Sequence, residues 1–515
     1  MNSVKSLRKR ASTPQYVSPN QLTLGGFETP FEQHLTITNR WVTLSKLIPW
    51  DKIVGQYDLQ FKSAEGRPPI SGRVVIGAVI IKHMLHLTDR ETIQQIQENV
   101  FMQYFLGYSS FTNEAPFSPS LFVEIRERLS LAILSGINDI IVYHSFESDS
   151  ASAHSSKDSG TDNDSTNAGV NNDTVVSKQS DTTAALPVNE GRLLMDATVA
   201  PQNITYPTDL KLLNAARLKS EQLIDKLYNQ QMHGTQKVRT YRQVARKDFL
   251  NTAKKKSKSA KEIYKANGTQ LRYLRRNLSH ITDLLRVYKA QCIPTELKQR
   301  DIEYLYVLEL VYHQQYKMFT ERNHTVEDRI VNIHQPYVRP IVRGKEGKKV
   351  EFGSKLQVSL VKGFAFLDKL SWNNFNEGKC LQGSVVGYRK RFGFYPEEVL
   401  ADQIYCNREN RKWLKELNIK LRAKPLGRPG KEALSNHVSP GERNPVEGKF
   451  GQAKVGYGLA NIGAKLKNTS ESWIATIILV LNLVNLTRLN LLYITNAIKN
   501  YFNSLGSKNY RELSF

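Results

Sequence analysis

Cysteine is scarce in this sequence, and a secretion signal is lacking at its start. The three cysteines, Cys292, Cys380 and Cys406, are far apart, and no histidine stands at a metal-ligand spacing from them. An odd, scattered set argues against a disulfide framework and a zinc site, and it indicates a reducing cytoplasm. Met1 to Arg10 is basic and has no apolar core of a signal peptide. We therefore expect a cytoplasmic protein.

Long hydrophobic runs are lacking as well. The most apolar stretch, Trp473 to Leu486, has 14 residues and contains Thr476, Asn482 and Asn485. Because the hydrocarbon core of a bilayer is about 30 Å thick, this stretch is too short and too polar to span it. We predict a buried helix here and no membrane partner.

Acidic residues are too few to balance the basic ones. The 515 residues include 72 Lys and Arg but only 48 Asp and Glu, so the net charge is +24. An excess of this size predicts a polyanionic partner, and nucleic acid is the commonest polyanion. The length allows about three domains.

Residues 66–144 predict a small helical domain that follows a basic and mixed segment, residues 1–65. Thr88-Asp-Arg-Glu91 has the pattern of a capping box at a helix start. With a turn at Gly66–Pro69, the apolar spacing predicts helices at Val74 to Leu87, Asp89 to Asn99 and Ser118 to Leu129. Three short helices are typical of a helix-turn-helix DNA-binding domain, and a purely structural bundle is the alternative.

Two segments differ sharply in composition from the rest. Residues 145–190 are acidic and rich in Ser, Asp, Asn and Thr, which predicts a disordered linker. Residues 210–329 are helical in pattern and basic, and Lys254–Lys256 and Arg272 are interleaved with Tyr264 and Tyr273. A solvated helix face is one interpretation, but the interleaving favours an arm that follows the DNA backbone.

Residues 191–209 and 330–499 alternate strands with helices, and residues 500–515 form a tail. Five strands are predicted, at Gly191–Ala200, Phe352–Val361, Phe364–Trp372, Glu398–Ile404 and Ile419–Ala423. Helices are predicted at 374–392, at 408–417, around residue 447 and from 473 to 499. This order predicts an α/β fold.

Three carboxylates are candidates for chemistry. Asp196 lies on the first strand, Asp402 near the end of the fourth and Glu447 on a late helix. Mg²⁺ prefers oxygen ligands, and two such ions can activate an attacking hydroxyl and stabilise the leaving oxygen in phosphoryl transfer. Turn or cap roles are the alternative for each acid, and we assign Asp209 and Asp368 to turn or surface roles.

The helix that carries Glu447 also carries two cations on the same face. Arg443 precedes Glu447 by four residues, and Lys454 follows it by seven. A surface ion-pair ladder is the alternative interpretation. Gly448 and Gly451 weaken the helix and let a ligand come close, which favours a functional site.

Three ordered blocks resemble the DDE transposases of bacterial insertion sequences. Leu194-Met-Asp196-Ala-Thr-Val-Ala-Pro-Gln-Asn203 resembles the first-Asp strand of that family, and Ala401-Asp402-Gln-Ile-Tyr405 resembles its second-Asp block. Arg443-Asn-Pro-Val-Glu447-Gly-Lys-Phe-Gly-Gln-Ala-Lys454 resembles its Arg–Glu–Lys signature. Gly66–Gly107 is similar to the N-terminal helical domain of the family.

This resemblance implies a fold, a metal site and partners. The fold would be an RNase H-like mixed five-stranded sheet with strands one and four adjacent, split by a helical insertion at 210–329 and preceded by the α-helical domain. Asp196, Asp402 and Glu447 would hold two Mg²⁺ or Mn²⁺ ions. DNA would be contacted by basic residues, namely Arg443, Lys454, Lys449, Arg339, Arg343, Arg411 and Arg428. A bacterial, nucleoid-associated transposase that acts as a homodimer on inverted repeats and target DNA is expected.

The sequence departs from the family pattern at two positions. Pro440 stands where the signature often has Tyr, and Ile404 stands where the second block often has Gly. The first departure removes a hydroxyl contact, and neither changes a metal ligand. Two alternative functions remain open: a DNA-binding protein that has lost catalysis, and an RNase H-like nuclease that cuts without joining.

Overall fold

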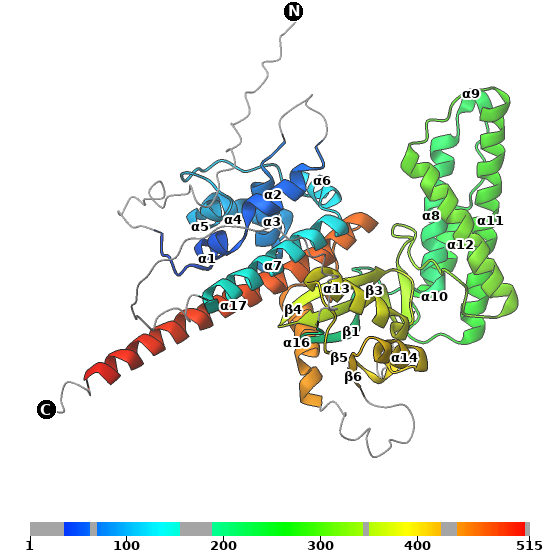
Figure 1. Cartoon of the computed structure of the whole chain (residues 1–515). Helices are drawn as coiled ribbons and strands as arrows, with labels where there is room; N and C mark the ends of the chain where they lie inside the picture. Colours follow the sequence, from blue (N-terminus) through cyan, green and yellow to red (C-terminus); the bar gives the residue numbers. More distant parts are fainter. Residues whose placement is uncertain (1–34, 62–68, 155–187, 343–349, 424–439, 510–515) are drawn as a thin grey trace, which may run out of the picture.

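The structure is a computed structural model, and it describes residues 35–61, 69–154, 188–342, 350–423 and 440–509. A sheet lies at the centre, with one group of helices beside it and a second, elongated group to the other side (Figure 1). The molecule therefore belongs to the α/β class, as the sequence predicts. Arg343, Arg428 and residues 155–187 of the predicted linker lie outside the described residues.

The sheet is mixed and has six strands among the described residues, in the order β2-β3-β1-β5-β6, with β4 also paired to β3. β3 is antiparallel to β1, β2 and β4, whereas β5 is parallel to both β1 and β6. The bounds are β1 Arg192–Pro201, β2 Arg339–Val342, β3 Val350–Val361, β4 Phe364–Ser371, β5 Glu398–Leu400 and β6 Lys420–Arg422. This arrangement is compatible with an RNase H-like sheet.

The prediction of five strands is wrong by one. All five predicted strands are present, and β2 is the additional strand at the edge next to β3. Its four residues, Arg-Pro-Ile-Val, are too few to show the alternation that identifies a strand, and Pro340 lowers its strand propensity. Proline is tolerated there because an edge strand needs fewer backbone donors.

Seven helices precede the sheet within the described residues. They are α1 Arg40–Leu47, α2 Trp50–Asp58, α3 Gly72–Met84, α4 Asp89–Glu98, α5 Val100–Phe105, α6 Leu121–Arg128 and α7 Leu131–His154. The capping box at α4 is confirmed, because Thr88 accepts from the Glu91 N–H and Glu91 accepts from the Thr88 N–H. α7 continues through His154, so the prediction of a linker is wrong for residues 145–154.

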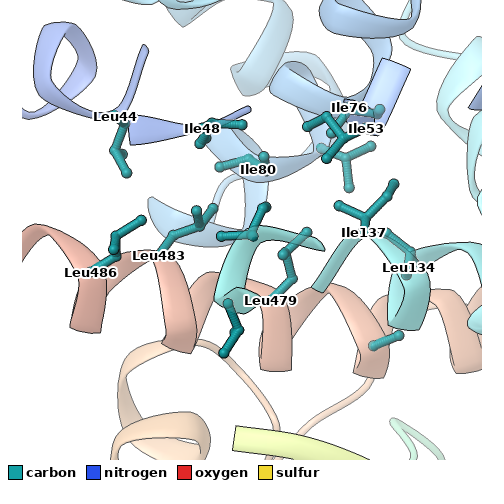
Figure 2. Close-up of a cluster of buried hydrophobic side chains, with 14 of the residues drawn as sticks. Leu44, Ile48, Ile53, Ile76, Ile80, Leu134, Ile137, Leu479, Leu483 and Leu486 are labelled. Atoms are coloured by element: carbon teal, nitrogen blue, oxygen red, sulfur yellow. The ribbon is translucent and has the colours of Figure 1, made fainter. Parts of the chain in front are cut away.

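The last helix, α17 (Lys467–Asn509), lies between the N-terminal helices and the sheet (Figure 1). One of its faces packs on the sheet through Ile474, Ile477, Ile478 and Leu481. The opposite face packs on α1–α7 through Ala475, Leu479, Leu483 and Leu486 (Figure 2). Burial on two sides explains why this stretch is the most apolar of the chain.

α17 is one continuous helix, and it extends past the boundary at residue 499 that the sequence predicts. Within the part of the chain that the structure describes, Lys467–Leu492 is the one unbroken helix long and apolar enough to cross a membrane. In the fold, 61% of its apolar window is buried inside the protein. The buried helix predicted at Trp473 to Leu486 is therefore present.

Five helices stand in the chain between β1 and β2. They are α8 Asp209–Leu227, α9 Gln230–His233, α10 Arg242–Ala253, α11 Ala260–Ala290 and α12 Gln299–Glu321. They have an apolar core of their own, which includes Leu213, Leu223, Leu274 and Leu308. These helices form the elongated group in Figure 1.

The remaining described helices follow β4 in the chain. They are the 3₁₀ helix η2 Glu377–Cys380, α13 Leu381–Phe392, the 3₁₀ helix η3 Gln403–Tyr405, α14 Arg408–Glu416 and α16 Pro440–Gly456. Val446 and Ala453 of α16 pack into the same apolar cluster as Leu356 and Val358 of β3. The sheet therefore fixes the position of α16.

Candidate active site

The parallel pairing of β1 with β5 brings Asp196 and Asp402 to the same level. Leu194 is the register partner of Leu400, and each aspartate stands two residues further along its chain. On β1, side chains two residues apart point to the same face. Asp402 lies just past the end of β5, which stops at Leu400 and not at Ile404 as predicted. The prediction that strands one and four are neighbours is confirmed.

Each aspartate is also held by a local hydrogen bond. Asp196 Oδ1 accepts from the Ala197 N–H at 2.8 Å. Asp402 is the N-cap of η3, and its Oδ1 accepts from the Gln403 N–H at 2.7 Å. One oxygen of each carboxylate is therefore oriented by the backbone.

Arg443 of α16 joins the two aspartates. Its Nη1 lies 3.2 Å from Asp402 Oδ1, and its Nη2 lies 3.5 Å from Asp196 Oδ2. The side chain of Arg443 is 21% exposed, and its Nε is buried without a hydrogen bond among the described residues. One cationic group therefore lies within reach of both carboxylates, which establishes that they converge.

The two aspartates differ in their surroundings. The side chain of Asp196 is 18% exposed, and that of Asp402 is 53% exposed. Burial raises the pKa of Asp196 to about 6, although the Ala197 N–H and Arg443 act in the opposite direction. The negative charges of Glu377 and Asp402 raise the same pKa further. A carboxylate with a raised pKa next to other acids is typical of a functional site.

Glu447 is exposed and lies one helical turn after Arg443 on α16. Within the described ranges, no three His, Cys, Asp or Glu side chains form a group that could hold a metal ion. The structure therefore brings together Asp196 and Asp402 with Arg443, but it does not bring Glu447 into the same group. At Gly448 and Gly451 an added Cβ would meet no atom within 4 Å, so this side of α16 is open.

The other predicted DNA contacts lie in different surroundings. Lys449 is half-buried, and burial, aided by the charge of Arg488 on α17, lowers its pKa to about 8. Arg339 donates to the carbonyl of Pro336, and burial lowers its pKa. Lys454 is half-buried on α16, and Arg411 is exposed on α14. Of the four, Arg411 is the most accessible.

Sequence reasoning missed two polar pairs beside the aspartates. The buried Tyr405 hydroxyl donates to Gln357 Oε1 at 2.8 Å. Glu377, whose charge reaches Asp196, pairs with Lys355 at 2.8 Å. Lys355, Gln357 and Ser359 alternate with apolar residues on β3, and all three are buried. This alternation in the sequence of β3 could have indicated the two pairs, because buried polar residues on a central strand need hydrogen-bond partners.

The two acids that were predicted to have turn or surface roles lie in different surroundings. Asp209 is in the first turn of α8, where it accepts from Arg329 at 2.7 Å. Asp368 is on β4 and not at the surface, since its side chain is 7% exposed. It pairs with Arg391 at 3.2 Å, and burial raises its pKa. The surface role predicted for Asp368 is therefore wrong.

Comparison with known proteins gives three findings. Residues 399–484 match the family described as Transposase DDE domain, and this match contains Asp402, Arg443 and Glu447. Residues 29–128 match the family described as Transposase domain (DUF772), which spans α1–α6. An uncharacterized protein, ORF8 in the nfe locus of Rhizobium meliloti, is 25% identical over 206 residues, which are 40% of this chain and 80% of that protein.

No solved structure matches the chain. The two family matches follow each other in the order that the sequence blocks predict, the helical block first and the acid-bearing block second. Together, the two family matches support a DDE transposase of insertion sequences.

Proposed function

We propose that this transposase binds the inverted repeats at the ends of its own insertion sequence. It hydrolyses the phosphodiester there and joins the freed 3′-OH to target DNA. The observation that carries this proposal is the convergence of Asp196 and Asp402 on the single guanidinium of Arg443. Two carboxylates, one on β1 and one just past the parallel strand β5, are suited to hold the divalent ions of phosphoryl transfer.

The donor set suits Mg²⁺ or Mn²⁺. Asp196 and Asp402 offer carboxylate oxygens within reach of one cationic group, and hard divalent ions bind such oxygens together with substrate phosphates. Asp196, Asp402 and Glu447 are the proposed ligands, with Glu447 approaching from the next turn of α16. When bound, a pair of such ions would activate the nucleophile and stabilise the leaving oxygen.

The protein groups around the acids have separate tasks. Arg443 is the proposed phosphate contact, because a guanidinium presents two parallel donors to phosphate oxygens. Lys454 and the exposed Arg411 are further proposed contacts to the DNA backbone. The open side of α16 at Gly448 and Gly451 gives the DNA room to come close.

The rest of the chain supports DNA as the partner. The net charge of +24 favours binding to a polyanion, and the N-terminal helices are the proposed module for the repeat ends. Joining two ends requires two active sites, so a homodimer on DNA is part of the proposal. A cytoplasmic protein without a membrane partner is also part of it, and the burial of α17 supports this.

A strand-cleavage and joining assay tests the proposal. The substrate is labelled DNA with the inverted repeats that flank the gene, supplied with Mg²⁺ or Mn²⁺, and the wild-type protein is compared with Asp402→Asn. We expect metal-dependent nicking at the repeat ends and joined products from the wild type only. Binding without cleavage would favour a DNA-binding protein that has lost catalysis, and cleavage without joining would favour a nuclease. Cleavage that persists in Asp402→Asn would show that the acids are wrongly assigned.

A further inference from the structure

The positive charge of the protein is concentrated in one part of the helical insertion. Residues 237–276, here called the cationic segment, contain fourteen Lys and Arg but two acids, a net charge of +12. This is half of the charge of the whole chain. The next stretch, residues 277–303, has four basic and four acidic residues and is neutral. α11 runs through both stretches, so one helix carries a basic part and a neutral part.

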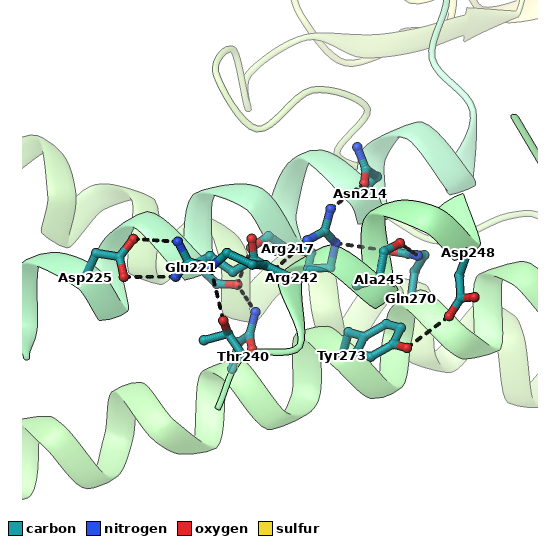
Figure 3. Close-up of polar contacts among 12 residues, drawn as sticks. Asn214, Arg217, Glu221, Asp225, Thr240, Arg242, Ala245, Asp248, Gln270 and Tyr273 are labelled. Carbon is teal, nitrogen blue, oxygen red and sulfur yellow. Dashed lines mark hydrogen bonds and ion pairs between the residues drawn. The ribbon is translucent and has the colours of Figure 1, made fainter. Parts of the chain in front are cut away.

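The cationic segment is fixed to the rest of the bundle by its polar groups (Figure 3). Arg242 makes a bidentate pair with Asp225 of α8, at 2.9 and 3.0 Å. Gln270 of α11 donates to the Ala245 carbonyl of α10 at 3.1 Å, and Tyr273 donates to Asp248 at 2.9 Å. These bonds hold α10 against α8 and α11, and they engage the nearby acid Asp248.

Nine cations of the segment are exposed without an ion pair among the described residues. Six of these stand at α10, in the loop after it and on the first two turns of α11. They are Arg246, Lys247 and Lys254 at α10, Lys256 in the following loop, and Lys261 and Lys265 on α11. None of the six forms an ion pair within the described part of the protein. The outer face of α10 is also hollowed, by about 650 Å³ between residues that include Arg246, Lys247 and Lys254.

The tyrosines of the segment contact other side chains of the bundle, although Tyr241 and Tyr264 are still 46% and 40% exposed. Tyr264 stacks on Phe319 of α12, with ring centroids 4.2 Å apart and an angle of 11° between the rings. Tyr273 is bonded to Asp248, and Arg276 lies over both Tyr241 and Tyr273. The interleaving seen in the sequence therefore serves packing. The exposed face offers cations, which contact phosphates, and few rings on which bases could stack.

We propose that six of the exposed cations form a second DNA surface, separate from the cleavage site. This surface contacts the duplex backbone and does not read its sequence. It consists of Arg246, Lys247, Lys254, Lys256, Lys261 and Lys265. This inference rests on the proposed function for the identity of the polyanion. Crowded like charges repel one another, and nothing else in the described structure neutralises these six. A duplex neutralises them and releases its counterions, which favours binding.

Salt-dependent binding by the full-length chain tests the surface. The probe is a fluorescent duplex of unrelated sequence, titrated by anisotropy in the absence of divalent metal at several salt concentrations. The test variant carries Arg246→Gln, Lys247→Gln, Lys254→Gln and Lys261→Gln. The slope of log K against log salt should become shallower by about 2 to 4, since each lost phosphate contact contributes about 0.9.

The control variant removes the same charge from the neutral stretch, through Arg286→Gln, Lys289→Gln, Lys298→Gln and Arg300→Gln. We expect its slope to equal that of the wild type, and both variants to keep the wild-type melting temperature. An unchanged slope in the test variant, or equal losses in both variants, would overturn the proposal. So would a wild-type chain that does not bind the duplex. A chain that binds as expected but does not cleave repeat ends contradicts the proposed function alone.

Discussion

Arg443 and Asp196 are 247 residues apart in the chain, and their side chains meet at 3.5 Å between helix α16 and strand β1. The same guanidinium also reaches Asp402. A divalent cation held by both carboxylates would therefore have to compete with Arg443 for them. A protein cation at this place compensates for the mutual repulsion of the two acids.

This relationship predicts competition between Arg443 and metal. Arg443→Ala should raise the affinity for Mn²⁺ by roughly 3- to 10-fold, because an ion pair of about 1 kcal/mol no longer has to be broken. The measurement is calorimetric titration of the DNA-free protein. Arg286→Ala, which removes a cation paired to Asp283 in the insertion, is the control and should leave the affinity unchanged. Weaker Mn²⁺ binding by Arg443→Ala would show that the guanidinium helps to assemble the site.

The raised pKa of Asp196 predicts a pH dependence of stability. Its value of about 6 exceeds the ordinary 3.8, so the folded state binds the proton more tightly than the unfolded state does. The stabilisation is complete below about pH 4 and is lost as the pH rises through 6. Asp196→Asn lacks this titration. Between pH 4 and pH 7.5 its free energy of unfolding should therefore rise by up to about 3 kcal/mol relative to that of the wild type.

Chemical denaturation at several pH values measures this difference. The exposed Glu409→Gln is the control, and its curve should run parallel to that of the wild type. The attraction between Arg443 and the ionised Asp196 is already included in the pKa of about 6, so the change of stability with pH reports the net effect of all these groups. If the unfolding free energy of Asp196→Asn changed with pH between 4 and 6 as steeply as that of the wild type, the assignment of this pKa would be contradicted.

The Tyr405–Gln357 pair predicts a coupling energy. Tyr405→Phe leaves Gln357 Oε1 buried without its donor, which should cost about 1–3 kcal/mol of unfolding free energy. Gln357→Leu should cost a similar amount, and the double variant should cost less than the sum of the two. Urea unfolding of the four proteins completes the cycle. Additive losses would mean that the two residues stabilise the fold separately.

The hydrogen bonds of Asn482, which connect α17 to β4 and α7, predict a large effect of its replacement on stability. It accepts from the Ala365 N–H of β4, and it donates to the Ala365 carbonyl and to Asn138 Oδ1 of α7, each at 2.7 Å. Asn482→Ala should destabilise the protein by about 2–4 kcal/mol, because these buried groups lose their partner. Thermal unfolding measures the loss. Asn490→Ala, later on α17, is the control, and a similar loss in both variants would count against the specific role of Asn482.

Local patterns were sufficient to predict much of the fold. The Thr88 capping box and the alternation in β3 and β4 each lie within a dozen residues, so their physical causes are visible in sequence. The edge strand β2 is too short to show a pattern. The surroundings of Asp368 depend on Arg391, a partner 23 residues away on another element, which no local pattern reveals.

In the candidate site, too, some features could be predicted from local sequence and others depend on packing. Asp196, Asp402 and Arg443 could be selected from their sequence blocks, and the register of β1 and β5 brings the aspartates together. The burial of Lys449 and Arg339 could not be predicted from sequence. For Lys449 it depends on the packing of α16 beside α17, and for Arg339 on the contact of its side chain with the Pro336 carbonyl. Sequence identifies cations, but packing decides which of them reach a ligand.

The position of α17 has a consequence for synthesis of the protein. This helix contributes to the apolar core of the N-terminal helices and to that of the sheet, yet it follows both of them in the chain and leaves the ribosome after them. The N-terminal helices emerge first and must keep Ile80 and Ile137 uncovered until Leu479 and Leu483 arrive. A nascent chain therefore holds two incomplete cores until α17 has emerged, and this single helix closes both.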